Sequence, residues 1–309
     1  MKHTIICLTL LAALLAARCT KEAHPTASEN PGIAAMFSPG ADAAPEVLRM
    51  FNEYGVWVRD TFTSIVELTN GYLEVDNVVR ARGAQPLDPA LKEEVIAYSA
   101  DLLANVSSAF SRAFFPLEIV YVQSYGVNWW VYPLKRLGRS RLIISWPNTT
   151  AGTIPVTDPA NHYYQDSVLT LGVWNLIGPA IAARFDEPLA EFVAAGKAYD
   201  NGKAYDQIYN AYQSDGDAEK YAAALDELTR DGGFLSGNGS RDFRSDFAEW
   251  IRLVATESHE NIRARYLDNS PARAAKYDVL VRFARQYEWD IQAAGNAFRA
   301  GHEAYKASL

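Results

Sequence analysis

The sequence predicts an α+β protein that is mainly helical, with a small sheet in the N-terminal half and a helical C-terminal half. Two short runs of β-branched and aromatic residues, 117–122 and 141–146, are bounded by Gly, Pro and Asn and are typical of strands. Apolar residues at spacings of three and four recur on both sides of these runs, which indicates helices. A hydrophobic content of 49% in 309 residues is enough to bury a sizeable core.

The N-terminus is predicted to be a secretory signal peptide covering residues 1–18. An apolar run over residues 5–17 is short for a membrane span but suits the central region of a signal. The two cysteines are Cys7, inside this run, and Cys19, directly after it. We therefore expect an exported protein whose mature part contains no internal disulfide.

Cys19 is the predicted lipid attachment site. The segment resembles bacterial lipoprotein signals, in which small residues such as Ala16 and Ala17 precede the modified cysteine, although Arg18 departs from that pattern. The alternative is cleavage near Ala17, which would give a soluble periplasmic protein. Residues 20–22 resemble the short lysine-acidic signal that directs some gram-negative lipoproteins to the cell surface.

Charge and composition limit the partners. The net charge of −8 becomes −10 when the signal removes the positive charges of Lys2 and Arg18, and no run of basic residues interrupts the chain. A nucleic-acid partner is therefore not expected. The 17 tyrosines and 7 tryptophans have two interpretations, as ordinary core and surface residues or as an aromatic contact surface.

A flexible tether is predicted over residues 19–44, which are rich in Pro, Ala, Ser and Gly, and a folded domain over residues 45–309. The domain comprises an α/β subdomain to about residue 185 and a helical subdomain after it. Pro45 is placed to begin a helix over residues 45–58. Asp88 and Pro89 are typical of a helix start, and apolar spacing continues that helix to residue 110.

A third strand is predicted over residues 125–133, between the two clearer ones. The adjacent Trp129 and Trp130 within it have two interpretations. They either form a platform for a ligand, or face opposite sides of the sheet as neighbouring strand residues do.

Helical periodicity returns from residue 166 to residue 181, where Pro179 is expected to kink or end the helix. Further helices are predicted over residues 191–199, 217–229, 243–257, 272–287 and 291–306.

The order of these elements is that of the zincin metallopeptidases, and several short segments make the resemblance narrower. The segments are residues 114–116, residues 187–192 with the downstream Tyr199, residues 233–236, residues 246–249, and residues 277–291. Together they resemble the substrate import-associated zinc metallohydrolase lipoproteins, a family of zinc-binding metallopeptidases associated with nutrient import across the outer membrane of gram-negative bacteria. The resemblance covers residue 88 to the C-terminus and implies a zincin-like fold.

In that family the helix that corresponds to residues 166–181 carries HExxH. Histidines at positions i and i+4 share one helix face and bind zinc, and the glutamate between them activates the metal-bound water. The resemblance places these positions at Trp174, Asn175 and Gly178. Tryptophan offers a metal no lone pair, asparagine cannot accept a proton from water, and glycine has no ligand atom. The sequence is therefore interpreted as a degenerate member that lacks the zinc site.

Asp246 and Glu249 correspond to the acidic segment that follows in the family and supplies the third zinc ligand. One carboxylate cannot hold zinc alone. Their alternative interpretation is a solvated helix face, or a partner for Arg241 and Arg244.

Other histidines offer weak alternatives. His259 begins a stretch that resembles HExxH, but Arg263 replaces the second histidine and the stretch follows the acidic segment instead of preceding it. His162 and Tyr163, in a polar loop, are either surface residues or binding residues that approach the lost site from the strand side.

The resulting hypothesis is a catalytically inactive, zincin-like lipoprotein that serves as a binding accessory to nutrient import at the outer membrane, on its surface or periplasmic face. A transporter complex is the expected partner, a peptide or glycan the expected ligand, and no cofactor is expected. One alternative is an active metallopeptidase that binds zinc through His162, His259 or His302 together with acidic residues. Another is a structural subunit of a surface complex.

Overall fold

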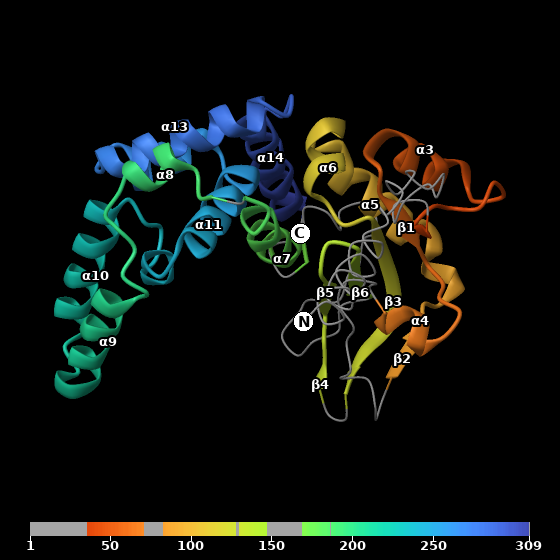
Figure 1. Cartoon of the computed structure of the whole chain (residues 1–309), viewed down its shortest axis with the longest axis horizontal. Coiled ribbons are helices and arrows are strands. Elements are labelled where there is room, and N and C mark those ends of the chain that lie inside the picture. The colour runs from red at the N-terminus through yellow and green to blue at the C-terminus, as the bar shows by residue number, and fades with distance from the viewer. Residues whose placement is uncertain (1–35, 71–82, 128–129, 147–168, 186, 309) are drawn as a thin grey trace, which may run out of the picture. The chain divides into compact units, whose positions relative to one another are not determined.

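The computed structural model describes residues 36–70, 83–127, 130–146, 169–185 and 187–308. The chain divides into two compact units, Met1–Ser38 and Pro39–Leu309. The second unit contains all the elements discussed below (Figure 1). Cys19, the signal peptide and most of the predicted tether lie outside the described residues.

A six-stranded mixed sheet forms the β part of the fold. Its strands are β1 (Trp57–Arg59), β2 (Gly83–Pro86), β3 (Glu118–Val127), β4 (Trp130–Val131), β5 (Leu134–Leu137) and β6 (Arg141–Ser145). The order is β1-β3-β6-β5; β1 and β6 run parallel to β3, β5 is antiparallel to β6, and β2 and β4 are antiparallel to β3.

The two clear strand predictions are confirmed as β3 and β6. The predicted third strand is partly wrong, because residues 125–127 continue β3 and the short β4 follows as a separate strand. Trp129 lies outside the described residues, as does the side chain of Trp130, so the predicted tryptophan platform stays a prediction.

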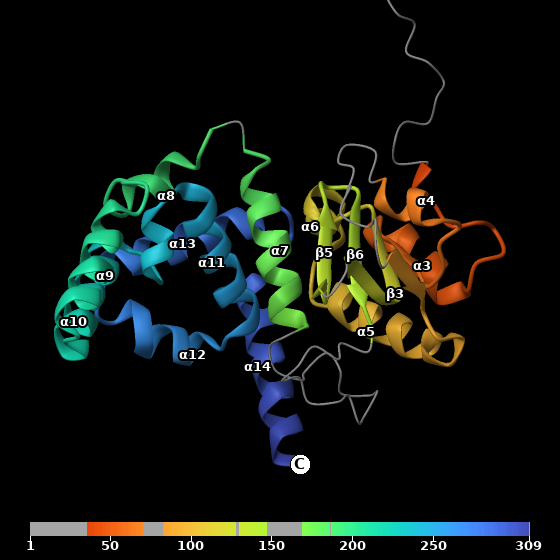
Figure 2. The ribbon, with the colours of Figure 1, turned by 90° about the horizontal axis from the view of Figure 1, so that it is seen from below.

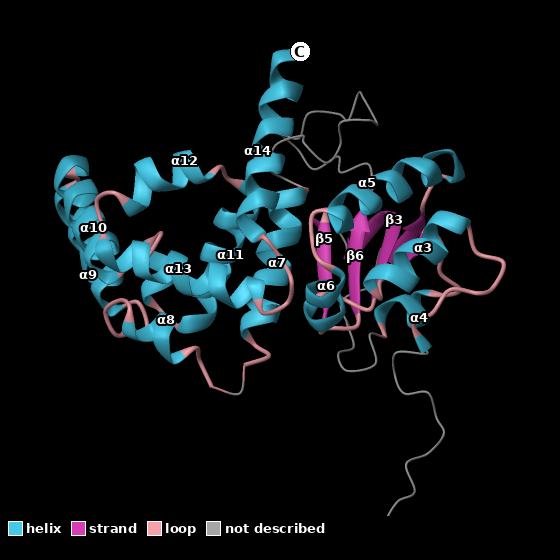
Figure 3. Ribbon diagram, turned by 90° about the horizontal axis from the view of Figure 1, so that it is seen from above, coloured by secondary structure: helices cyan, strands magenta, loops and turns pink. Residues whose placement is uncertain are grey.

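Alternate residues of the strands face opposite sides of the sheet, as the strand period requires. One face contributes Ile119, Tyr121, Leu142 and Ile144 to the main core, which also contains side chains of several helices. Figure 3 shows helices beside the sheet. The other face contributes Val120, Val122 and Ile143 to a smaller cluster with Leu68. The sheet is therefore buried on both faces.

A buried ion cluster joins the parallel strands at one end. Glu118, on β3, is fully buried and accepts a hydrogen bond from Arg59 Nη1 at 2.9 Å and another from Arg141 Nε. Glu67 pairs with the same two arginines, at 2.8 Å and 3.0 Å. Because strand register places Trp57, Glu118 and Arg141 side by side, the cluster holds three neighbouring strands together.

Helices make up most of the remaining structure. They are α3 (Pro45–Tyr54), α4 (Ile65–Thr69), α5 (Lys92–Ala104), α6 (Ser108–Phe114), α7 (Thr170–Ala182), α8 (Ala190–Ala194), α9 (Lys203–Asp215), α10 (Ala218–Gly232), α11 (Phe243–Thr256), α12 (His259–Ile262), α13 (Pro271–Arg285) and α14 (Ile291–Ser308). Short turns of helix are η1 (Pro89–Leu91), η3 (Gly237–Ser240) and η4 (Arg263–Leu267). The predicted α+β class is confirmed.

Several helix boundaries differ from the predictions. The helix predicted over residues 88–110 is divided, because the Ser107 side chain accepts a hydrogen bond from the Phe110 N–H and begins α6. The helix predicted over residues 45–58 ends at Tyr54, where Gly55 adopts φ 73°.

Of the two outcomes predicted for Pro179, a kink or a helix end, the end is wrong, since α7 continues to Ala182. Proline costs the hydrogen bond to the carbonyl of Asn175, but Asn175 is exposed, so water can solvate that carbonyl. Ile181 and Ala182, which follow Pro179, are buried, and their burial stabilises the last turn of the helix.

Aromatic rings join the C-terminal helices to α6, the helix that directly precedes β3. Phe110 on α6 lies 4.3 Å from Trp289 and 6.5 Å from Phe283, measured between ring centroids. The Trp289 indole N–H also donates to the carbonyl of Asn105 at 2.8 Å. Among the described residues, no helix is both long and apolar enough to cross a membrane.

Candidate functional site

Helix α7 carries Trp174, Asn175 and Gly178, the positions that the resemblance relates to HExxH, and it lies directly against α11 (Figure 2). At Gly178 the two backbones nearly touch. A Cβ atom added there would lie 3.0 Å from Ala248 Cβ, 3.1 Å from its Cα and 3.2 Å from its carbonyl oxygen. A side chain at this position would be tightly crowded by Ala248, so close packing of the two helices favours glycine.

Trp174, one turn earlier on α7, belongs to the core, with 1% of its surface exposed. Its ring stacks on Trp289 with 5.6 Å between centroids and 9° between planes. Phe115 meets it edge-on at 5.8 Å. Its indole N–H has no hydrogen-bond partner among the residues that the structure describes. Trp174 therefore serves packing.

Asn175 is exposed. The three positions thus have three different environments, and none of them fits zinc. Tryptophan and glycine provide no ligand atom, and an asparagine amide has no basic lone pair with which to activate a water. The residues present do not fit the metal that the resemblance implies.

The acidic pair lies on the other side of α11. Successive residues of a helix are about 100° apart, so Asp246 and Glu249 lie roughly 160° and 100° around the axis from Ala248, in the same direction and about 60° from each other. Gly178 contacts Ala248, whereas the free oxygens of Asp246 and Glu249 face Gly239. The structure therefore brings Asp246 and Glu249 together but does not bring them to Trp174 and Gly178.

Asp246 is fully buried and forms an ion pair with Lys276 of α13, also fully buried, with 2.5 Å between Oδ2 and Nζ. The Tyr199 hydroxyl donates to the same oxygen at 2.9 Å. Burial raises the pKa of the Asp246 carboxyl to about 7, although Lys276 and Tyr199 lower it. Burial also lowers the pKa of the Lys276 ammonium.

Lys276 lies in a cage of three aromatic rings. Its Nζ is 4.3 Å from the ring centroid of Phe234, 5.2 Å from that of Phe192 and 5.7 Å from that of Tyr199. The ring faces carry partial negative charge and stabilise the ammonium. A side chain on Gly196 would collide with Lys276, since a Cβ there would lie 2.9 Å from Nζ. The three aromatic rings therefore stabilise the buried ammonium group of Lys276.

Glu249, one turn after Asp246, accepts a hydrogen bond from the Ser236 hydroxyl at 2.6 Å. Its other oxygen, Oε2, and Asp246 Oδ1 have no hydrogen-bond partner within the described chain. Both lie within 3.4 Å of the point where a Gly239 Cβ would be. Burial raises the pKa of the Glu249 carboxyl.

The interpretation of Asp246 as part of a solvated face, or as a partner of Arg241 and Arg244, is wrong. Asp246 is buried and pairs with Lys276. Arg241 instead pairs with Asp206 at 3.2 Å. The sequence offered no signal for Lys276, because it is thirty positions from its partner and is one more polar residue in an amphipathic helix.

The remaining candidate residues do not add to this site. His259 is exposed, with its ring 5.7 Å from Tyr277, whereas His302 is buried and stacked on Phe298. His162 and Tyr163 lie outside the described residues. In the described ranges no group of three or more His, Cys, Asp or Glu residues is arranged to hold a metal ion.

Comparison with known proteins yields one similar structure. No protein-family model and no curated protein matches the chain. Among solved structures, the chain is similar to a "putative zinc-binding metallo-peptidase" from Bacteroides caccae, with 13% sequence identity and a TM-score of 0.47. The match covers 88% of this chain and 97% of that chain. A likeness at this level carries no chemistry from that protein to this one.

Proposed function

We propose that this protein is a zincin-like lipoprotein that acts by binding and has no hydrolase activity. The observation that carries the proposal is the environment of α7. Trp174 is stacked in the core and Gly178 lies against the backbone of α11, so the face that would hold zinc is used for packing.

The charge balance around Asp246 supports the same proposal. A buried carboxylate is costly unless a cation compensates it. Lys276 supplies that cation from within the chain, at 2.5 Å, and Tyr199 adds a hydrogen bond. The carboxylate that the resemblance relates to a zinc ligand therefore needs no metal to be stable in the folded protein.

The proposed setting follows from the N-terminal sequence. Lipid on Cys19 would anchor the chain to the outer membrane, and residues 19–44 would act as a flexible linker between the membrane and the folded part. The proposed role is an accessory to a nutrient transporter, on the cell surface or the periplasmic face, with a peptide or glycan as ligand.

A hydrolysis assay tests the absence of catalysis. The full chain is incubated with casein and with a fluorogenic peptide mixture, with and without added zinc and with a zinc chelator. We expect no cleavage above background in any condition. Cleavage that disappears with the chelator and returns with zinc would refute the proposal.

The anchor is tested separately by metabolic labelling with palmitate and by membrane fractionation. The native chain is expected to carry label and to sediment with membranes, and Cys19→Ala to lose both. A native chain that stays unlabelled and soluble would refute the lipoprotein part of the proposal.

A further inference from the structure

The helical hairpin formed by α9 and α10 carries an aromatic surface that the other described residues leave largely uncovered. The two helices run side by side (Figure 1). No side chain of α9 is fully buried, and on α10 only Thr229 and Gly232 are buried, both near its C-terminal end. Four tyrosines lie on the hairpin: Tyr205, Tyr209, Tyr212 and Tyr221.

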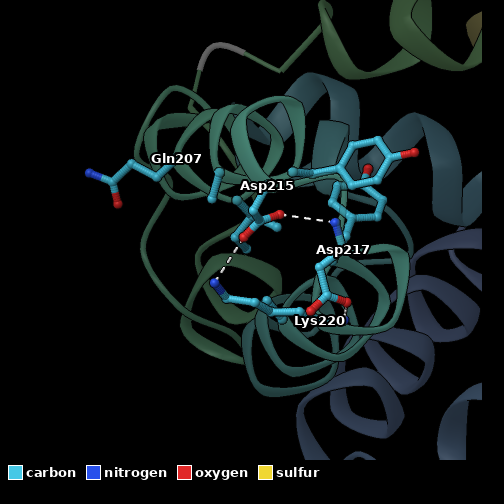
Figure 4. A pocket seen from close by; sticks show the side chains of 9 residues that line it. Gln207, Asp215, Asp217 and Lys220 are labelled. Atoms are coloured by element: carbon cyan, nitrogen blue, oxygen red, sulfur yellow. Dashed lines mark hydrogen bonds and ion pairs between the residues drawn. The ribbon is translucent and has the colours of Figure 1, made fainter.

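A pocket of about 240 Å³ opens between the two helices near their connecting turn (Figure 4). Ile208, Ala211 and Ala224 line it together with the rings of Tyr212 and Tyr221, whose centroids are 4.9 Å apart. An apolar cavity of roughly 150 Å³ already accommodates benzene. The pocket is therefore large enough for one aromatic or large aliphatic side chain.

Charged groups stand at the mouth of this pocket. Lys220 donates to Asp215 at 3.0 Å, and Asp217 caps α10 by accepting from the Lys220 N–H at 2.9 Å. Across residues 203–231 there are seven acidic side chains and three basic ones. An occupant with positive charges beside an apolar group would match both the rim and the pocket.

The same features disfavour two other occupants. A second copy of the chain would place one acidic hairpin against another, which costs free energy. A sugar needs several hydrogen-bonding groups in its site, but the walls are mainly apolar.

We propose that the α9–α10 pocket docks a segment of a partner protein that presents one aromatic or large aliphatic anchor flanked by Lys or Arg. The inference rests on the proposed binding role and names the chemistry of the partner. It is independent of the zinc question, since no residue of the hairpin belongs to α7 or α11.

Fluorescence anisotropy with the full chain tests the docking site. The probe is a labelled synthetic peptide with one tryptophan between lysines; one comparison peptide replaces the tryptophan with alanine, and another replaces the lysines with glutamates. We expect the first peptide to bind at least about tenfold more tightly than either comparison peptide. Its affinity should fall as salt is raised from about 0.05 to 0.5 M.

Matched variants locate the binding. Ala224→Phe fills the pocket, whereas Ala222→Phe adds the same ring at an exposed position of α10 outside it. We expect Ala224→Phe to weaken the first peptide about tenfold and Ala222→Phe to leave it unchanged. Circular dichroism checks that both variants fold.

Glu219→Lys, on the exposed surface of α10, provides a second test that does not disturb packing. It should weaken the lysine-containing peptide, and Glu53→Lys on α3 should not. No binding, equal binding of the alanine peptide, or equal effects of Ala222→Phe and Ala224→Phe would overturn the docking proposal. Dimers that disappear in Ala224→Phe would overturn it in favour of self-association. None of these results would alter the zinc and hydrolysis measurements.

Discussion

Replacing Lys276 with methionine probes the buried charge pair most sharply. The variant keeps the length of the side chain but leaves Asp246 fully buried without a counter-ion. Removing one partner of a buried ion pair costs about 3–5 kcal/mol. We expect a loss of this size in the free energy of unfolding at pH 8. Lys197→Met is the control, because Lys197 is 56% exposed and its ion pair spans 3.8 Å; its cost should stay below about 1 kcal/mol.

The loss of unfolding free energy caused by Lys276→Met should depend on pH. The pKa of Asp246 is raised to about 7 in the folded protein, and loss of Lys276 raises it further. A carboxyl with a raised folded-state pKa favours folding most at pH values below its unfolded pKa, near 4, and loses that contribution as pH rises through the folded pKa. The cost of Lys276→Met should therefore be smaller at pH 5 than at pH 8.

Urea unfolding followed by tryptophan fluorescence at both pH values gives the free energies by linear extrapolation. The double variant Asp246→Leu with Lys276→Met should recover much of the loss, since neither charge is then left unpaired. The reasoning would be refuted by a Lys276→Met cost that matches Lys197→Met or does not change with pH.

Two further substitutions test the packing of the fold by the same measurement. Gly178→Val should destabilise the protein by about 1–3 kcal/mol, because the added side chain meets the Ala248 backbone. Asn175→Val, on the exposed face of α7, is the control and should cost less than about 1 kcal/mol. Equal costs would contradict the close contact at Gly178. Glu118→Gln removes the buried negative charge between two arginines and should lower the free energy of unfolding by about 3 kcal/mol. Glu46→Gln, in an exposed ion pair, should lower it by less than about 1 kcal/mol. A small effect at both positions would mean that the buried cluster adds little stability.

Local signals predicted much of the fold. Asp88 begins η1 by accepting from the Ala90 N–H, and Asp217 begins α10 in the same way. The Asp88 cap was predicted because the capping side chain and the helix lie next to each other in the sequence. β1 and β5 were missed because three or four residues are too few to show a period. α9 was missed although it is amphipathic, because its sequence is mainly polar and none of its side chains is fully buried.

The site depended on contacts between distant parts of the chain. Gly178 looks like an isolated glycine in a helix until Ala248, seventy residues later, is seen against it. The pairing of Asp246 with Lys276 joins α11 to α13 and follows no spacing rule. The assignment of Trp174, Asn175 and Gly178 to the HExxH positions stays a prediction. The packing of the helices places Gly178 against Ala248 and the free oxygens of Asp246 and Glu249 near Gly239.

The zinc content of the purified chain tests the central claim most directly. The full chain is prepared without chelators, exchanged into metal-free buffer, and measured by elemental mass spectrometry before and after incubation with zinc. Because Trp174, Asn175 and Gly178 provide no ligand set, the account predicts far less than one tightly held zinc per chain in both samples. One zinc per chain that survives buffer exchange, and whose removal abolishes hydrolysis, would contradict it.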